Sequence, residues 1–377
     1  MKLQRKNRLR ATALGALAVS GALVLTACGS DDNTGTDADG GKTSAAASNI
    51  KCDDAEGQLR ASGSSAQKNA MDLWVKNYMA ACSGVEINYS SSSSGEGIVA
   101  FNQGTVGFAG SDSALKPEEV AESKKICKTG QGINLPMVGG PIAVGFHLEG
   151  VDSLTLDAST LAKIFDNKIK KWNDPAIAKL NDGVKLPATD IQAFHRSEDS
   201  GTTQNLGKYL NAAAPSDWKY EAEKKWPAPG GQAASGSSGV ASQVKAVNGS
   251  IGYFELSYAK SQDITTVDIN TGGATPVEAT SENASKAIAA AKVKGTGKDL
   301  ALELDYTTKA EGAYPLVLVT YEVVCDTGNK ADTLGTVKSF LTYTASADGQ
   351  KVLTDAGYAP IPEAINAKVR ETVAGLK

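Results

Sequence analysis

The sequence predicts an α/β protein built from two lobes that are joined by two crossing strands. Short apolar segments alternate with amphipathic ones along most of the chain, which is typical of parallel α/β structure. About 325 residues follow residue 50, which is more than one hydrophobic core usually serves. A late β-branched run, Leu316–Val324, is long enough to return the chain to the first lobe.

The first lobe is predicted to begin with residues 51–141. One amphipathic helix is indicated by residues that recur at helical spacing: Met71, Trp74, Val75, Tyr78, Met79 and Cys82. Three short strands are expected around it and after it, at Gln58–Ala61, Val85–Tyr89 and Val106–Ala109. A second short helix through Val99 and Phe101 precedes the third strand. This alternation predicts a βαβ unit with parallel strands.

Residues 142–316 are predicted to form the second lobe, and residues 317–377 to complete the first. The expected crossing strands are Ile142–Phe146 and Leu316–Val324. The polar segment Gly230–Gly239 is predicted to be a loop. The remaining expected elements are a helix face at Leu161, Ile164 and Phe165, a strand at Ser250–Phe254, and helices at Ser285–Ala291, Lys338–Tyr343 and Pro362–Val373, the last with its proline at the first helical position.

The N-terminal segment indicates export. Five cations precede an uncharged apolar run, Ala11–Ala27, so residues 1–27 are predicted to be a signal peptide. The run ends in Leu25-Thr26-Ala27-Cys28, which resembles the lipobox of bacterial lipoproteins and implies cleavage before a lipidated Cys28. The alternative is an ordinary signal peptide with an incidental cysteine. Residues 28–50 are predicted to be a flexible tether, because Gly29–Asn49 has no large apolar residue.

The charge of the mature chain limits its partners. Cleavage removes five cations and no acidic residue, so the formal net charge changes from −4 to −9. An acidic protein without a Lys/Arg stripe is not expected to bind nucleic acid. An anion site in such a protein must depend on local hydrogen bonds rather than on long-range attraction.

The four remaining cysteines predict two disulfides, because an even number of cysteines in an oxidising compartment is normally paired. Three connectivities are possible. Cys52–Cys82 is favoured, since Cys52 precedes the first strand and Cys82 ends the first helix, and this leaves Cys127–Cys325. Only His147 and His195 are present and there is no Cys-x-x-Cys pair, so no metal or other cofactor is expected.

Four segments place small and hydroxyl residues between a strand end and a helix start. Helix N-termini offer unpaired N–H donors, and Ser and Thr add hydroxyl donors, so such segments bind oxyanions. Each segment alone has a simpler explanation: a serine helix cap, a flexible serine loop, or a surface ion pair of Arg196. The segments are Ser62–Ala66, Ser93–Gly97, Gly110–Asp112 and Arg196–Thr202.

From about Gln58 to Leu376 the chain resembles the PstS family, the phosphate-binding proteins of bacterial phosphate ABC transporters. The most specific motif is His195–Thr202, because the family places an arginine four residues before Ser-Gly-Thr. The resemblance implies a two-lobed periplasmic-binding-protein fold of the Venus-flytrap type II with two hinge strands. Other family-like stretches are Ile169–Asp174, Ile177–Asn181, Gly249–Tyr253 and Tyr314-Pro315.

The resemblance also implies a set of ligand residues for the anion. The family usually has Thr-Phe where this chain has Ser65-Ala66, so Ser64 is an alternative to Ser65. Glu198 stands where the family has Asp and is expected to hold the guanidinium of Arg196. The implied ligands are Ser65, Ala66, Ser94, Asp112, Arg196, Ser200, Gly201 and Thr202.

Asp112 is expected to select the anion. Phosphate still carries a proton at neutral pH that a carboxylate can accept, whereas sulfate has none to give. The expected function is extracytoplasmic capture of inorganic phosphate and its delivery to the permease and ATPase subunits of an ABC transporter. The protein is expected to be a monomer held at the membrane by its lipid, and not an enzyme.

Three alternatives remain open at this point. The protein could bind another tetrahedral oxyanion such as sulfate or molybdate. It could be a serine hydrolase, although the sequence has no Gly-x-Ser-x-Gly motif. It could also be a cell-wall adhesin that keeps the fold without the ligand.

Overall fold

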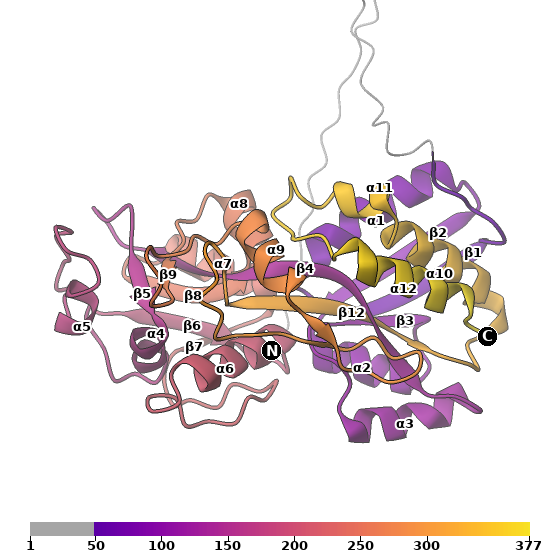
Figure 1. The fold of residues 1–377 in the computed structure, drawn as a ribbon, viewed down its shortest axis with the longest axis horizontal. Coiled ribbons are helices and arrows are strands. Elements are labelled where there is room, and N and C mark those ends of the chain that lie inside the picture. Colours follow the sequence, from indigo (N-terminus) through magenta and orange to yellow (C-terminus); the bar gives the residue numbers. More distant parts are fainter. Residues whose placement is uncertain (1–48) are drawn as a thin grey trace, which may run out of the picture. The chain divides into compact units, whose positions relative to one another are not determined.

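The main feature of the protein is one eight-stranded sheet with the strand order β2-β1-β3-β12-β4-β8-β6-β7. The structure is a computed structural model that describes residues 49–377. β12 and β4 are neighbours in the middle of the sheet and run side by side between two groups of elements (Figure 1). The predicted signal peptide, Cys28 and nearly all of the predicted tether lie outside the described residues.

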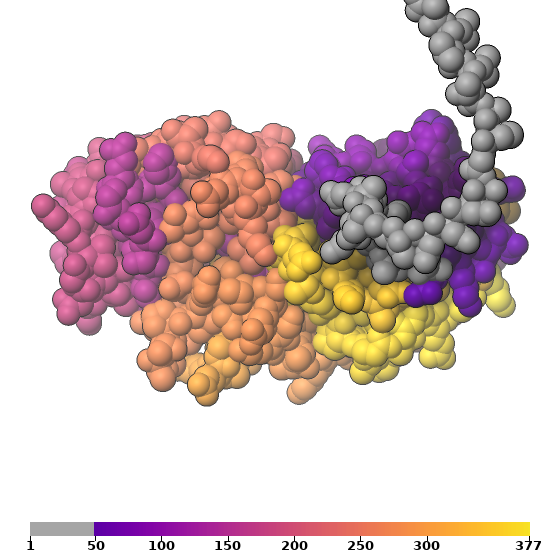
Figure 2. Space-filling view, turned by 90° about the horizontal axis from the view of Figure 1, so that it is seen from above, coloured from indigo at the N-terminus to yellow at the C-terminus, as the bar shows by residue number. Residues whose placement is uncertain are grey.

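The first lobe is built on three parallel strands: β1 (Gly57–Ser64), β2 (Val85–Ser92) and β3 (Phe108–Ser111). Its first helix buries Met71, Trp74 and Tyr78, the face that the helical spacing predicted. The helices are α1 (Lys68–Ala81), α2 (Ser94–Asn102), α3 (Pro117–Cys127), α10 (Ala331–Thr344), α11 (Ala347–Lys351) and α12 (Glu363–Ala374). The last residues of the chain return to this lobe, where α10 packs on β1 and α1; Figure 2 shows the C-terminal residues in yellow next to this indigo part of the chain.

The second lobe repeats this arrangement with β6 (Gln192–Arg196), β7 (Gln232–Ala234) and β8 (Ser250–Glu255), which are also parallel. Read from each outer edge, the strand order is second, first, third in both lobes. Two small sheets flank the main one: β5 (Thr155–Asp157) with β9 (Asp268–Asn270), and β10 (Lys292–Val293) with β11 (Leu302–Glu303). The helices are α4 (Ala158–Phe165), α5 (Pro175–Ala178), α6 (Gly201–Ala213), α7 (Gly236–Ala246), α8 (Leu256–Gln262) and α9 (Ser281–Ala289).

The two crossing strands are β4 (Gly132–His147) and β12 (Val317–Cys325), which pair antiparallel along the whole of β12. The expected strand Ile142–Phe146 is therefore too short, because β4 begins ten residues earlier than expected. Pro136 and Pro141 obscured the first part of this strand. Pro136 lies opposite Tyr321, beside a register shift, and Pro141 pairs with the first residue of β12, so neither interrupts a regular stretch of the ladder.

The segment Gly230–Gly239, predicted to be a loop, contains β7 and the first turn of α7. Its Gly and Ser residues have low intrinsic helix propensity, but burial of Val240, Ala241 and Val244 further along α7 stabilises the helix. A smaller correction concerns Pro362, which is the N-cap of α12 rather than its first residue.

Both predicted disulfides are present. Cys52 and Cys82 join the start of the first lobe to the end of α1, with Cα atoms 5.5 Å apart. Cys127 and Cys325 join the end of α3 to the end of β12 at 5.4 Å. The favoured connectivity is thus confirmed.

Within residues 49–377, the helices are all too short or too polar to cross a membrane.

Candidate functional site

The carboxyl ends of five strands meet where the two lobes face each other. β1, β2 and β3 lead into Ser65, Ser94 and Asp112, and β6 and β7 lead into Ser200 and Ser237. All five of these residues are at most 4% exposed. Ligands of open α/β sheets bind at this end of the strands, so the topology itself selects this place as the candidate site.

Three tyrosines bind the backbone carbonyls of the first loop, Ser62–Ala66. Tyr89, Tyr258 and Tyr358 donate their hydroxyls to the carbonyls of Ser64, Ser65 and Ala66 at 2.8, 2.6 and 2.7 Å. Burial raises the pKa of each tyrosine, so the three hydroxyls stay protonated donors. Carbonyl oxygens that would repel an anion are therefore bonded elsewhere.

The side chains of Ser64 and Ser65 point to different partners. The Ser64 hydroxyl accepts a hydrogen bond from the Ala66 N–H at 3.0 Å and is used within its own loop. The Ser65 hydroxyl accepts from the Ser237 N–H of the second lobe at 3.0 Å. Ser65 is therefore the serine of this pair that contacts the opposite lobe.

Ser94 links the two lobes. It is the first residue of α2, and Ser93 caps the helix by accepting from the Glu96 N–H at 3.2 Å. The Ser94 hydroxyl is free of that role and accepts from the N–H groups of Asp112 at 3.1 Å and Gly201 at 3.2 Å. The approach is so close that a Cβ atom on Gly201 would lie 2.6 Å from the Ser94 hydroxyl oxygen.

Asp112 provides the carboxylate at the centre of the cluster and is 2% exposed. Its Oδ1 accepts from the hydroxyl of Thr320 at 2.9 Å, and its Oδ2 accepts from the hydroxyl of Thr202 at 3.0 Å. Thr320 lies on β12, next to the register shift of that strand. The carboxylate is thus held from the hinge side and from the second lobe at once.

Arg196 provides the cation of the cluster and is 2% exposed at the end of β6. Its Nε donates to Glu198 at 2.6 Å, and its Nη1 donates to the Ser237 hydroxyl at 3.3 Å. Burial alone would raise the pKa of Glu198, but the guanidinium and hydrogen bonds from Ser197 and Gly236 outweigh it and lower that pKa. Glu198 therefore stays ionised beside the guanidinium of Arg196.

Ser200, Gly201 and Thr202 form the start of α6. The Ser200 hydroxyl caps the helix by accepting from the Thr203 N–H at 3.3 Å, and the Ser200 N–H donates to the Lys224 carbonyl at 2.9 Å. The Thr202 hydroxyl lies between Asp112 and Nη1 of Arg196, which is 3.5 Å away. All eight residues predicted to bind the anion thus lie in one connected cluster or directly beside it.

The sequence analysis missed Ser237, a fully buried residue in the first turn of α7. It contacts both Ser65 and Arg196, so it joins the first loop to the guanidinium. The sequence did contain a sign of this residue. Ser235–Gly239 consists of Ser and Gly and lies between a strand and a helix, as the four predicted segments do. Its position on β7–α7 corresponds to that of Ser94 on β2–α2 in the other lobe.

The cluster can hold a small tetrahedral oxyanion. The cluster contains hydroxyls, N–H groups of helix starts and one guanidinium. These groups are hydrogen-bond donors, and the oxygens of an oxyanion are acceptors. The charges of Asp112, Arg196 and Glu198 sum to −1, so binding here depends on hydrogen bonds more than on net attraction. Asp112 supplies an acceptor for a ligand that carries a proton.

Two further carboxyl groups are fully buried near Asp112. Burial, with a smaller contribution from the charge of Asp112, raises the pKa of Glu255 on β8 and of Glu322 on β12 to about 8 each. Neither carboxyl oxygen of Glu322 makes a hydrogen bond of normal geometry with another residue in the range 49–377. These groups are therefore protonated at neutral pH and add no negative charge beneath the site.

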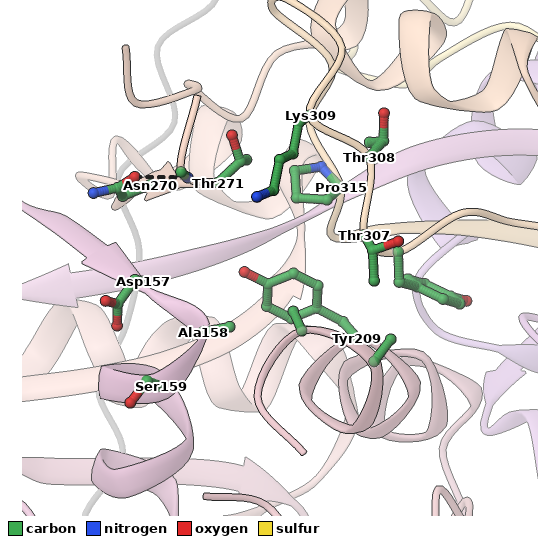
Figure 3. Close-up of a pocket in the computed structure, with 14 residues that line it drawn as sticks. Asp157, Ala158, Ser159, Tyr209, Asn270, Thr271, Thr307, Thr308, Lys309 and Pro315 are labelled. Atoms are coloured by element: carbon green, nitrogen blue, oxygen red, sulfur yellow. Dashed lines mark hydrogen bonds between the residues drawn. The ribbon is translucent and has the colours of Figure 1, made fainter. Parts of the chain in front are cut away.

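A pocket of about 410 Å³ lies elsewhere, on the second lobe, where Tyr209 and Lys309 face Asp157 across it (Figure 3). None of the residues predicted to bind the anion belongs to its wall. Its walls come from the start of α4, the end of α6 and two loops, and they offer a mixture of charges. This pocket is distinct from the candidate site.

Two lobes on two hinge strands, with a donor-lined cluster between them, define a binding protein of the periplasmic type. Consistently, the family model of the PBP superfamily domain matches residues 44–348. The phosphate-binding protein PstS 3 of Mycobacterium tuberculosis is 42% identical over 377 residues, which cover 99% of each chain. The chain therefore belongs to the PstS family of phosphate-binding proteins.

Solved structures agree with this fold. A high-affinity periplasmic phosphate-binding protein solved with bound phosphate matches with a TM-score of 0.70 at 22% identity, covering 84% of this chain and 93% of the other. A phosphate-binding protein from Stenotrophomonas maltophilia matches with a TM-score of 0.67 at 19% identity, covering 85% and 96%. The predicted α/β fold with two lobes and two hinge strands is confirmed.

Proposed function

We propose that this protein binds inorganic phosphate between its two lobes and delivers it to the permease of an ABC transporter. One observation carries the proposal: Asp112 accepts hydrogen bonds from Thr320 and Thr202, and the Gly201 N–H and the Arg196 guanidinium contact the neighbouring hydroxyls of Ser94 and Thr202. Such a set fits a tetrahedral oxyanion that still carries a proton. The similarity to PstS proteins over nearly the whole chain supports the same ligand.

The proposed ligands are Ser65, Ala66 and Ser94 of the first lobe and Ser200, Gly201 and Thr202 of the second, together with Asp112 and Arg196. When phosphate enters, the hydroxyl of Thr202 turns from Asp112 to a phosphate oxygen, and the carboxylate accepts the phosphate proton instead. Thr320 keeps the other carboxylate oxygen in place. Because both lobes supply ligands, bound phosphate favours the closed arrangement of the lobes.

We propose no catalytic role for the serines of the site. A serine nucleophile needs a base within hydrogen-bond reach, and His195 is the histidine nearest in sequence. Its ring stacks on Trp226 with centroids 4.8 Å apart, and its Nδ1 is bonded to the Arg196 carbonyl at 2.9 Å. Hydrolysis of a chromogenic ester that Ser65→Ala abolishes would contradict this assignment.

The protein is proposed to act outside the cytoplasm as a lipid-anchored monomer. The support is the charged and apolar pattern of residues 1–27 and the lipobox-like sequence that ends at Cys28. Cys28→Ser should release the protein from the membrane fraction, and its retention there would contradict the anchor.

The lobe boundaries proposed at residues 141/142 and 316/317 place one break within β4 and the other immediately before β12.

Isothermal titration tests the proposed ligand directly. The mature protein, freed of bound anion by unfolding, dialysis and refolding, is titrated with phosphate, arsenate, sulfate and molybdate. Phosphate and the similarly protonated arsenate are expected to bind, and sulfate and molybdate to give no heat of binding. Tight binding of sulfate or molybdate without phosphate binding would replace the proposal with a different oxyanion.

A further inference from the structure

A pocket of about 310 Å³ lies at the junction of the two lobes and includes Asp112 in its wall. The other walls come from α6, from the segment around β10 and β11, and from β12. Liquid water occupies about 30 Å³ per molecule, so the pocket has room for an oxyanion together with several waters. The pocket therefore adjoins the candidate site, because Asp112 belongs to both.

Lys208 on α6 lines this pocket, seven residues beyond Gly201. At the rise of an α-helix its Cα lies about 10 Å further along the axis than the helix start that faces the anion. Its ammonium makes no hydrogen bond or ion pair with any other residue between 49 and 377. Burial lowers the pKa of Lys208, and the charge of nearby Lys224 lowers it further.

The neighbouring cations are paired, unlike Lys208. Lys294, also in the pocket wall, contacts Glu303 at 3.0 Å. Lys224 contacts Glu119 of the first lobe at 2.6 Å. Separation of the lobes would free Lys224 from Glu119 and, in the same loop, Glu223 from Lys116, so the charges of these two residues would offset each other. Lys208 is the cation of this wall that has no such counter-charge beside it.

An incoming anion needs such a group. The central cluster of Asp112, Arg196 and Glu198 carries a charge of −1 before the ligand arrives, and the mature protein as a whole is acidic. Both repel phosphate at a distance. A cation at the entrance of a low-dielectric cleft raises the local concentration of an anion and its association rate.

We propose that the pocket containing Lys208 is an entrance subsite that captures a tetrahedral oxyanion before it reaches Asp112. Lys208 supplies the attraction. The inference rests on the proposed function and adds a route to it. It predicts an effect on the rate of phosphate association rather than on the hydrogen bonds that hold phosphate once it is bound.

The test compares Lys208→Gln with Lys179→Gln in the full mature protein. Lys179 is an exposed lysine of the same lobe at the end of α5, so both variants lose one charge. Association of radiolabelled phosphate is measured by rapid filtration at salt concentrations from about 20 to about 300 mM. Lys208→Arg keeps the charge and serves as the rescue variant.

Lys208→Gln should associate with phosphate about threefold to tenfold more slowly at low salt, and the difference should shrink as salt increases. Lys179→Gln and Lys208→Arg should match the parent, and dissociation rates should change little. Equal rates for Lys208→Gln and Lys179→Gln, or a difference that persists at high salt, would overturn the inference. If the parent itself takes up no phosphate, the proposed function fails, which is a separate result.

Discussion

Asp112 has both carboxylate oxygens fixed, one by Thr320 of the hinge strand and the other by Thr202 of the second lobe. The donors around it favour any tetrahedral oxyanion of suitable size, so they cannot separate phosphate from sulfate. Rejection of sulfate requires an acceptor that meets an oxygen lone pair at close range with little water present. Asp112 is the acceptor placed for this role.

Asp112→Asn should therefore still bind phosphate while sulfate becomes a measurable competitor. The amide can keep an oxygen toward Thr320 and present its NH₂ group as a donor to either anion. A site with a buried unpaired acceptor discriminates by a factor of about 10⁴ or more, and most of this should be lost. Competition between sulfate and radiolabelled phosphate measures it. Exclusion of sulfate as strict as that of the parent would contradict the role of Asp112.

Glu322 on β12 should make the stability of the protein depend on pH. Its pKa is raised to about 8 in the folded protein, mainly by burial, whereas an unfolded glutamate titrates near 4.3. Between these values the folded state binds more protons than the unfolded state. The contribution to stability is therefore complete below about pH 4.3 and is lost as the pH rises through about 8.

Glu322→Gln cannot ionise and should escape this loss. The stability of the variant relative to the parent should increase by up to about 1.4 kcal/mol for each pH unit across this window. Urea unfolding at about pH 5.5, 6.5 and 7.5, all within that window, measures the difference. Glu149→Gln, at an exposed loop position, is the control. A difference between Glu322→Gln and the parent that does not vary with pH would contradict the account.

At the scale of elements, two ion pairs connect α3 of the first lobe to a loop of the second with opposite polarity. Lys116 pairs with Glu223, and Glu119 pairs with Lys224. The side chain of Lys224 is only 7% exposed, whereas that of Glu223 is 52% exposed. The Lys224 carbonyl also accepts the N–H of Ser200, so the buried pair is tied to the start of α6.

Glu119→Gln should speed phosphate release, because it leaves Lys224 buried without a counter-charge when the lobes are closed. Gln can still accept the hydrogen bond from the Lys116 N–H that caps α3. We expect the dissociation rate to rise about tenfold, whereas Glu223→Gln, which breaks the exposed pair, should change it less than about threefold. Chase experiments with labelled phosphate measure both. Equal rates for the two variants would contradict a role of the buried pair in closure.

Most elements that form the site could be predicted from the sequence. Each combines a local run of small and hydroxyl residues with a place in the alternation of strands and helices. Ser65 and Asp112 directly follow a strand and Arg196 ends one, and each belongs to a segment of small and hydroxyl residues that precedes a helix. Ser237 was missed because β7 has only three residues, none of them large and apolar. The contacts of Thr320 were also beyond reach, since they depend on a register shift between β12 and β4 that no local pattern encodes.

At the scale of the whole molecule, the two-lobed fold and both disulfides followed from the sequence, but the extent of the crossing strands did not. Gly139, Gly140 and two prolines conceal the first part of β4, and only pairing with β12 makes this segment a strand. Among the inter-lobe contacts, the ion pairs of α3 join residues more than 100 positions apart, and Asp112 and Thr202 are 90 positions apart. Such contacts appear only once both lobes are folded and placed on the hinge.

The central claim is that phosphate binds in the cluster between the lobes, with Arg196 as its cation. Titration of phosphate into the parent, Arg196→Ala and Arg60→Ala tests it most directly, since Arg60 is an exposed arginine on β1. Arg196→Ala removes a charge-assisted contact from a desolvated site and leaves Glu198 without its partner. It should weaken binding by several kcal/mol, with Arg60→Ala close to the parent. A loss below about 1 kcal/mol in Arg196→Ala would contradict the claim.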